Sequence, residues 1–412
     1  MKHFNKKYIL KFIVLRFSLV VAIFLFAIRI SFAQLDNTYL QDKISINQSD
    51  SAKIGLNINV FNYMRNTEYF NNIEKGRTLF GYQLNPKIFY SPNRYIKIET
   101  GLFLRNDFGG PNPYTYATPT LTIKTEYRNL SMLFGTLEGA LSHRIIEPMF
   151  DISAAIEKRI ENGFQLKYEN SKTFFDTWIN WEKFIERKSP FKEEFTVGLN
   201  LQKVVLYKNK TIQIENSNTN SSNAETKNSF SFSPIIQVMA KHRGGQIDLD
   251  TTNKFYVKIN SAIGFRLSKK FNISNTNHKG FIKELRIEPY YLLYKENSNS
   301  GMPFTDGNAY YLNALIKTNH FGLMLSYWLA KNFIAPNGTS IYQIQSADNP
   351  IYFSSEGKRE LLFFRLLYEK PLFNKLFMTA RFEPFYDFKS SQIDFSYSFY
   401  LSYNMDFKLS KN

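Results

Sequence analysis

The sequence contains no cysteine. Disulfide bonds, thiolate metal sites, cysteine nucleophiles and a lipid anchor on an amino-terminal cysteine are therefore excluded. Histidine is scarce, with five residues in the whole chain. None of the short spacings typical of a metal site joins His143, His242, His278 and His320. We expect no cofactor and no bound metal.

Long apolar runs are missing as well. The run from Phe17 to Ile28 covers only twelve residues between Arg16 and Arg29, whereas a transmembrane helix needs about 20. It follows a lysine-rich start and precedes Ser31-Phe32-Ala33, where small residues stand at the two positions that a signal peptidase reads. We therefore predict that residues 1–33 form an export signal that is cleaved from the chain. A retained membrane anchor is the alternative that the short run disfavours.

Acidic residues are fewer than basic ones, 35 against 52, which gives a net charge of +17. Six of the cations and none of the acids lie in residues 1–33, so the rest of the chain carries +11. This surplus favours anionic neighbours, such as outer-membrane lipid, lipopolysaccharide or anionic solutes. The cations are dispersed instead of clustered, which together with export argues against nucleic acid as a partner.

Aromatic residues and alternating patterns are abundant. The chain has 40 Phe and 26 Tyr, yet its mean hydropathy is −0.32. From Ile393 to Leu409, apolar residues alternate with small or polar ones, which is the two-residue period of a β-strand. This run is longer than the usual globular strand of about 5–6 residues and the roughly 9–11 residues that cross a bilayer. An aromatic chain that is not apolar overall is typical of a membrane barrel with a polar interior and an apolar exterior.

Strand-like segments follow one another along the rest of the chain. We predict an all-β fold, a single antiparallel transmembrane β-barrel of roughly 16–18 strands with long outer loops and short periplasmic turns. The barrel is expected to cover residues 52–409, after a periplasmic segment at 34–51 and before a tail at 410–412. Segments 149–159 and 211–216 are counted among its strands. A soluble secreted β-sandwich is the rival fold.

The closing strand carries a further pattern, because its apolar positions include Tyr403, Met405 and Phe407 close to the end of the sequence. In this respect the chain resembles the porin-like outer-membrane β-barrels of bacteria with two membranes. In that family the closing strand is the signal that the barrel-assembly machinery reads, so this machinery is an implied partner. The sequence departs from the family pattern by continuing through Leu409 to Asn412. The resemblance implies the outer membrane as the location of the protein after signal cleavage.

Oppositely charged residues two positions apart recur in the predicted strands. Arg286 and Glu288 flank an apolar residue, as do Arg381 and Glu383, and strand periodicity places each pair on one face. We expect these charges to face the lumen, either as a ring that selects solutes or as a neutralised wall that only hydrates the interior. The predicted pore-lining residues are Lys97, Glu99, Arg105, Asp107, Asp176, Asn180, Glu182, Glu284, Arg286, Glu288, Arg381, Glu383 and Asp387.

The segment from Gly135 to Asp151 lacks strand periodicity and is expected to fold inward as a constriction loop. It contains Ser142 and His143, a neighbouring pair with acids close by, as a serine hydrolase would need. Adjacent residues on a strand point to opposite faces, however, and such sites are assigned by geometry. Trp178, on a polar strand face, either stacks on a sugar ring or lies in an interfacial girdle of aromatic residues.

These features predict a porin-like channel for the passive passage of small polar solutes through a charged lumen. The first alternative is a structural or secretion-associated barrel that binds partner proteins or lipopolysaccharide. The second is an outer-membrane lipid hydrolase, either a phospholipase or a deacylase. With a channel as the main interpretation, we do not expect an enzyme. No feature of the sequence indicates an oligomeric state.

Overall fold

β-Strands make up most of the computed structural model, which describes residues 37, 40–214, 224–273, 281–297, 302, 304–346, 357–373 and 375–408. The predicted export signal, residues 1–33, lies outside these described residues. The strands are β1 (Lys53–Glu68), β2 (Thr78–Asn93), β3 (Ile96–Asp107), β4 (Tyr116–Tyr127), β5 (Leu130–Thr136), β6 (Asn162–Glu169), β7 (Thr173–Lys183), β8 (Glu193–Lys203), β9 (Leu206–Ile214), β10 (Ala224–Gly244), β11 (Tyr256–Ile273), β12 (Glu284–Glu296), β13 (Asp306–Lys317), β14 (Phe321–Lys331), β15 (Lys358–Phe373), β16 (Leu376–Asp387) and β17 (Gln392–Lys408). The short helical turns are η2 (Gln48–Asp50), η3 (Ala140–His143), α2 (Ala154–Glu157) and η4 (Ser340–Tyr342).

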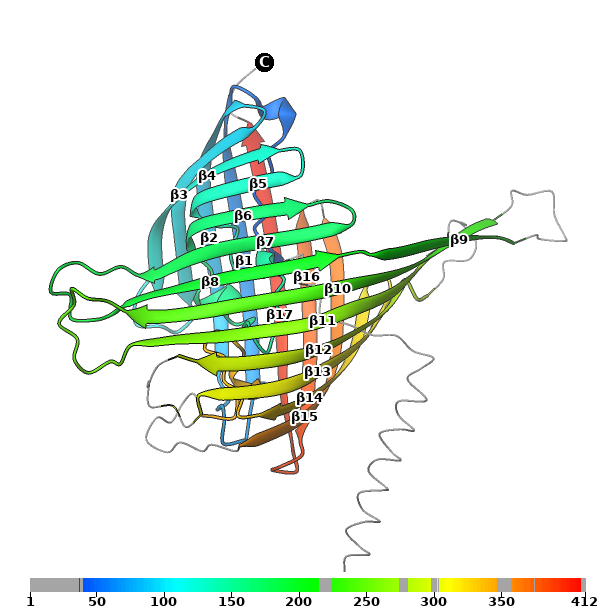
Figure 1. The fold of residues 1–412 in the computed structure, drawn as a ribbon. Helices are drawn as coiled ribbons and strands as arrows, with labels where there is room; N and C mark the ends of the chain where they lie inside the picture. Colours follow the sequence, from blue (N-terminus) through cyan, green and yellow to red (C-terminus); the bar gives the residue numbers. More distant parts are fainter. Residues whose placement is uncertain are drawn as a thin grey trace, which may run out of the picture.

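The strands form one sheet that closes on itself, because β1 pairs antiparallel with both β2 and β17. Strands β8 and β9 both pair with β10, at its residues 235–244 and 224–232, so the two share one position in the wall. The wall is therefore a closed antiparallel barrel of 16 strand positions. Figure 1 shows this wall and the paired ends of β9, β10 and β11 projecting beyond it. The predicted fold class and strand number are confirmed.

One segment predicted as a strand was assigned wrongly. Residues 149–159 are not a strand but a loop with the short helix α2, because Ile152, Ala155 and Ile156 are buried at helical spacing inside the barrel. The predicted strand at 211–216 is confirmed for residues 211–214, which end β9 and continue the wall position of β8; residues 215 and 216 lie outside the described residues. Among the described residues, no helix combines the length and the apolar character needed to cross a membrane.

The two ends of the barrel differ in the length of their connections. At one end, here called the turn end, short connections join β2 to β3, β4 to β5, β6 to β7, β13 to β14 and β15 to β16. At the opposite end, here called the loop end, the connections include 108–115, 137–161, 184–192, 245–255 and 332–357. Outer-membrane barrels carry their longer loops on the extracellular side. The loop end is therefore the outer end that the sequence analysis expected.

Aromatic rings gather on the outside of the wall near the loop end. Trp181 stacks on Phe195 with 5.0 Å between ring centres, Phe195 stacks on His242 at 4.6 Å, and Phe255 meets His242 edge-on at 5.5 Å. The four rings come from β7, β8, β10 and the segment before β11. Such a row is typical of the aromatic girdle at a membrane interface. Trp181 is exposed in this row, whereas Trp328 is fully buried inside the barrel.

Three segments fill the interior of the barrel. Residues 37 and 40–50, here called the N-terminal segment, enter from the turn end and bury Leu40 and Ile44. Residues 137–161 and 332–346, here called plug loop A and plug loop B, fold back from the loop end. Plug loop A is the inward-folded segment that the sequence predicted. Its Ile146 and Met149 share one apolar cluster with Tyr342 of plug loop B and with inward-facing wall residues.

Candidate functional site

Glu138 at the start of plug loop A fastens the loop to the wall and to the N-terminal segment. Its carboxylate accepts a hydrogen bond from the Lys124 ammonium at 2.9 Å, a second from Lys167, and a third from the backbone N–H of Ile44 at 3.2 Å. Burial would raise the pKa of Glu138, but the two lysines outweigh it and lower that pKa to about 2. Ion pairs that are this deeply buried persist only when their hydrogen bonds are satisfied. Glu138 therefore joins three parts of the chain inside the lumen.

His143 fastens plug loop A a second time. Its Nδ1 lies 2.8 Å from Asp176 and its Nε2 lies 2.9 Å from Glu161, so both ring nitrogens face carboxylates. The ring also stacks on the indole of Trp178, with 3.5 Å between centres and 5° between planes. Burial would lower the pKa of His143, yet the two carboxylates raise it to about 9. At neutral pH the imidazole is therefore a cation that donates from both nitrogens.

This arrangement excludes two roles considered from the sequence. Trp178 is only 3% exposed, so its ring is covered and cannot stack on a sugar, nor does it lie in the exterior girdle. Ser142 is buried beside His143, but both imidazole nitrogens are already engaged by carboxylates. His143 therefore cannot take a proton from the Ser142 hydroxyl, and the pair is not a hydrolase site.

Plug loops A and B are also tied to each other and to the opposite wall. Glu147 of loop A accepts hydrogen bonds from Arg365 at 2.6 Å and from the Tyr342 hydroxyl of loop B at 3.0 Å. Asn260 of β11 donates to the Ile334 carbonyl at 2.8 Å. These contacts, together with the shared apolar cluster, hold both loops inside the lumen.

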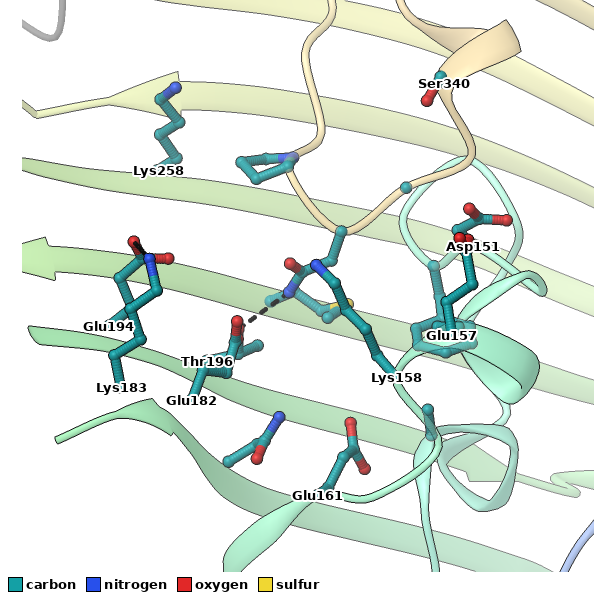
Figure 2. Close-up of a pocket in the computed structure, with 18 of the residues that line it drawn as sticks. Asp151, Glu157, Lys158, Glu161, Glu182, Lys183, Glu194, Thr196, Lys258 and Ser340 are labelled. Atoms are coloured by element: carbon teal, nitrogen blue, oxygen red, sulfur yellow. Dashed lines mark hydrogen bonds and ion pairs between the residues drawn. The ribbon is translucent and has the colours of Figure 1, made fainter. Parts of the chain in front are cut away.

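An open cavity of about 720 Å³ lies at the loop end of the plug, and it is here called the outer vestibule. Figure 2 shows plug residues such as Lys158 on one side and the wall residues Glu182 and Glu194 on the other. On the wall, the Glu194 carboxylate forms an ion pair with the Lys183 ammonium at 2.8 Å, and it forms further ion pairs with two other wall cations. Lys258 also lines this cavity and is 5% exposed. The vestibule is thus a charged chamber whose floor is the plug.

A second cavity of about 300 Å³ lies at the turn end, and it is here called the inner vestibule. Asp42 and Ser45 of the N-terminal segment line it together with the wall residues Lys87, Lys97 and Glu99. Lys97 lies 2.8 Å from Glu99, and Lys87 bridges Asp42 at 3.2 Å and Glu99 at 3.3 Å. The inner vestibule is therefore a second polar chamber, bordered by the N-terminal segment and the wall.

The predicted pore-lining residues all belong to strands and face the interior, but they do not surround an open passage. Asp176 holds His143, and Asn180 and Glu182 line the outer vestibule. Asp387 holds the buried Arg359 at 3.0 Å. Near the loop end, Arg105 lies against Asp107 at 2.6 Å.

The predicted pairing within each Arg/Lys-x-Glu motif is found in part. Lys97 does meet Glu99, as described above. Arg286 lies nearer Glu284, at 2.9 Å, than Glu288, at 4.0 Å. Within the described chain Arg381 has no ion pair with Glu383, because Glu383 instead faces Arg365 at 3.2 Å. Alternation placed these charges on the correct face, but the choice of partner depends on neighbouring strands.

Several residues that shape the interior were not singled out from the sequence, namely Glu138, Glu147, Arg359, Arg365 and Lys258. Arg359 and Arg365 stand on the same inward face of β15 as Leu361 and Phe363. The sequence does contain a signal for these two arginines, since each stands at the two-residue spacing of the inward-facing apolar residues of β15. The two glutamates lie in plug loop A, where no periodic pattern indicates an inward direction.

Residues 46–412 match the family model described as "Lipid A 3'-O-deacylase-type". The chain belongs to this family. Solved structures with a similar fold include OccAB3 of Acinetobacter baumannii, with 11% identity, a TM-score of 0.42, and coverage of 86% of this chain and 99% of that one. OprD of Pseudomonas aeruginosa has 9% identity and a TM-score of 0.42, covering 87% and 94%. A BenF-like porin of Pseudomonas fluorescens Pf-5 has 8% identity and a TM-score of 0.43, covering 87% and 100%. No curated protein matches the sequence.

Membership of this family places the chain beside acyl-ester hydrolases by description, whereas the geometry of the lumen is that of a plugged porin-like barrel. An ester hydrolase needs a nucleophile within hydrogen-bond reach of a base, or a metal that activates water. The Ser142 and His143 pair does not meet the first requirement. In the part of the chain that the structure describes, no group of three or more His, Cys, Asp or Glu side chains could hold a metal.

Proposed function

We propose that the protein is a gated channel of the bacterial outer membrane for small polar solutes, closed in this structure by plug loops A and B. The observation that carries the proposal is the pair of charged vestibules, about 720 Å³ and 300 Å³, which lie at the loop end and at the turn end of the lumen. A barrel of 16 strands is wide enough to leave an aqueous channel when its interior is not filled. A barrel that served only as a scaffold would not need a polar chamber at each end.

The plug is held in a way that permits movement. Its contacts to the wall are ion pairs, hydrogen bonds and one apolar cluster, with no covalent link beyond the ends of each loop. Both ends of plug loop A are anchored on paired strands, since Thr136 of β5 and Asn162 of β6 are register partners. The loop can therefore leave the lumen while the wall stays intact. Solute would then pass between the vestibules by diffusion.

Single-channel conductance in a planar bilayer tests the proposal. In one variant, residues 138–160 are replaced by a two-residue Asn-Gly turn, which suits the hairpin that Thr136 and Asn162 close. In the matched control, residues 109–113 of an exposed loop outside the lumen are replaced by the same turn. We expect brief, rare openings in the wild type and the control, and stable conductance in the plug variant. Silence from a folded plug variant, identified by its heat-modifiable mobility on gels, would refute the channel.

The second candidate function is hydrolysis of an acyl ester of lipid A, and it is favoured by the family match over residues 46–412. It requires a catalytic site other than Ser142 and His143. The test is mass spectrometry of lipid A from cells with and without the protein. Loss of one acyl chain only when the protein is present would support the enzyme, and the Ser142→Ala variant should then retain full activity. An unchanged lipid A in the presence of folded protein would remove this candidate.

A further inference from the structure

A third cavity lies in the lumen, bordered by plug loop A, the N-terminal segment and strands β2, β4 and β5. It has a volume of about 30 Å³ and is here called the middle cavity. Arg159 and Ile160 line both this cavity and the outer vestibule. Asp42 and Lys87 line both this cavity and the inner vestibule. The middle cavity is therefore adjacent to each vestibule, and the shared side chains form the partitions.

The side chains that line the middle cavity leave several hydrogen-bonding atoms unused. Oδ1 of Asn85, Oγ1 of Thr120 and Nη1 of Arg159 are buried, and none has a hydrogen-bond partner within the described residues. These atoms come from β2, β4 and the end of plug loop A, so three separate elements each contribute one. A buried polar group that stays unpaired costs about 1–3 kcal/mol. Such groups in proteins are normally satisfied by ordered water when no side chain reaches them.

The chemistry of the cavity indicates which occupant fits. Asn85 offers an acceptor, Arg159 a donor, and the Thr120 hydroxyl can do either. The charged side chains that line the cavity are two cations and two carboxylates, namely Lys87, Arg159, Asp42 and Glu138. Because these charges balance, the cavity favours neither a cation nor an anion. Water both donates and accepts, and a volume of about 30 Å³ has room for about two molecules at roughly 10–15 Å³ each.

Arg159 stands at the partition between the middle cavity and the outer vestibule. Its Nη2 donates to the Leu40 carbonyl of the N-terminal segment at 2.9 Å. Its guanidinium lies 4.9 Å from the centre of the Phe61 ring of β1. The tip of the side chain is thus anchored to two other parts of the chain. A guanidinium fixed at this partition would keep the connection narrow and place a positive charge in it.

We propose that the middle cavity holds water and joins the two vestibules into a continuous hydrated path past the plug, with Arg159 as the side chain that excludes ions and solutes from this path. The path needs no movement of plug loop A, so it does not rest on the proposed opening of the channel. A barrel that is closed to solutes would therefore still conduct water.

Osmotic water flow tests the path in liposomes that contain the refolded mature protein. Light scattering follows their shrinkage in sucrose, and liposomes without protein give the baseline. We expect the wild type to raise the water permeability and Thr120→Leu to return it to the baseline, because the larger apolar side chain occupies the cavity. Thr118→Leu is the matched control, since Thr118 stands two residues away on β4 and lines none of the three cavities. Its water permeability should equal that of the wild type.

The role of Arg159 is tested by conductance in a planar bilayer. Arg159→Ala should show a small steady conductance that the wild type lacks, because the charged partition is removed. Arg144→Ala is the matched control, since Arg144 belongs to the same loop, pairs with Glu169 at 2.6 Å and lines none of the three cavities. An unchanged conductance of folded Arg159→Ala would overturn the role given to this arginine.

Folding of every variant is checked by heat-modifiable mobility on gels. If Thr120→Leu does not fold, Asn85→Leu replaces it, because this change removes the acceptor at similar side-chain size. Equal water permeability of the wild type and the folded leucine variant, or of the wild type and protein-free liposomes, would overturn the path. Silence of the plug variant together with normal water flow in the wild type would refute the channel and leave the path standing.

Discussion

Glu138 allows the strength of the plug to be predicted from the structure. The Glu138→Gln variant keeps the shape of the side chain but leaves the Lys124 and Lys167 ammonium groups buried without their counter-charge. The folded barrel lowers the pKa of Glu138 from 4.5 to about 2. At about 1.4 kcal/mol for each pKa unit, this shift corresponds to roughly 3 kcal/mol of stability at neutral pH. Breaking a buried ion pair by removing one partner costs a similar amount, about 3–5 kcal/mol.

The sign of the pH dependence follows from the direction of the shift. A carboxyl group with a lowered pKa stabilises the folded state above its ordinary pKa, and the contribution is lost as pH falls from 4.5 toward 2. The difference between wild type and Glu138→Gln should therefore be about 3 kcal/mol at pH 7 and should have largely disappeared at pH 2. Urea unfolding followed by tryptophan fluorescence at both pH values measures it.

Glu126 provides the matched control, because it is a second acidic partner of the same lysine. It lies 3.5 Å from Lys124, but its side chain is 39% exposed. Exposed pairs contribute about 0–1 kcal/mol, so Glu126→Gln should have little effect at either pH. The reasoning fails if Glu138→Gln costs no more than Glu126→Gln at pH 7, or if its cost is the same at pH 2.

Three further perturbations test other parts of the interior. His143→Gln should destabilise the barrel below pH 6.5 and lose this effect as pH rises through about 9, because the folded barrel stabilises only the protonated imidazole. Urea unfolding at pH 6 and pH 10 measures the difference. An equal loss of stability at both pH values would contradict the prediction. Arg365→Ala should lower the free energy of unfolding by about 3 kcal/mol, because it leaves the largely buried carboxylate of Glu147 without its cation. It should also increase cleavage of plug loop A by added protease, and an unchanged cleavage rate would argue against this tether. Gly198→Ala should cost about 1–3 kcal/mol, because the added Cβ would lie 2.1 Å from the indole that stacks on His143. Gly322→Ala is its control, since the nearest atom there is 3.6 Å away, and equal melting temperatures for the two variants would disprove the steric argument.

The wall of the barrel could be predicted from the sequence because alternation is a local property. In β17, each inward position is small or polar and each outward position is mostly apolar, so direction follows from residue type alone. The prediction failed at residues 149–159, since a four-residue helix with two buried apolar residues is too short to show a helical period. The break between β8 and β9 also has no local signal, because only the shared partner β10 makes them one position.

The interior could be predicted much less completely. The inward fold of plug loop A followed from its lack of periodicity, but the partners of Glu138 and Glu147 come from strands that are distant in sequence. Pairing in the lumen is decided by which side chains meet across strands and loops. For this reason Glu383 meets Arg365 instead of Arg381, although the sequence places Arg381 and Glu383 two residues apart on one face.

The junction at Glu138 also bears on the order in which the barrel is built. The N-terminal segment and plug loop A touch each other deep inside the lumen, whereas the seam between β1 and β17 needs the last strand of the chain. If the barrel closed first, the N-terminal segment would have to insert into the lumen past the ion pairs that line its wall. We therefore expect the N-terminal segment and plug loop A to pack together first. The sheet would then form around them, and pairing of β17 with β1 would close the barrel last. The packed plug would then template the closure of the barrel. Weakening its contacts should slow barrel assembly as well as lower the stability of the folded barrel.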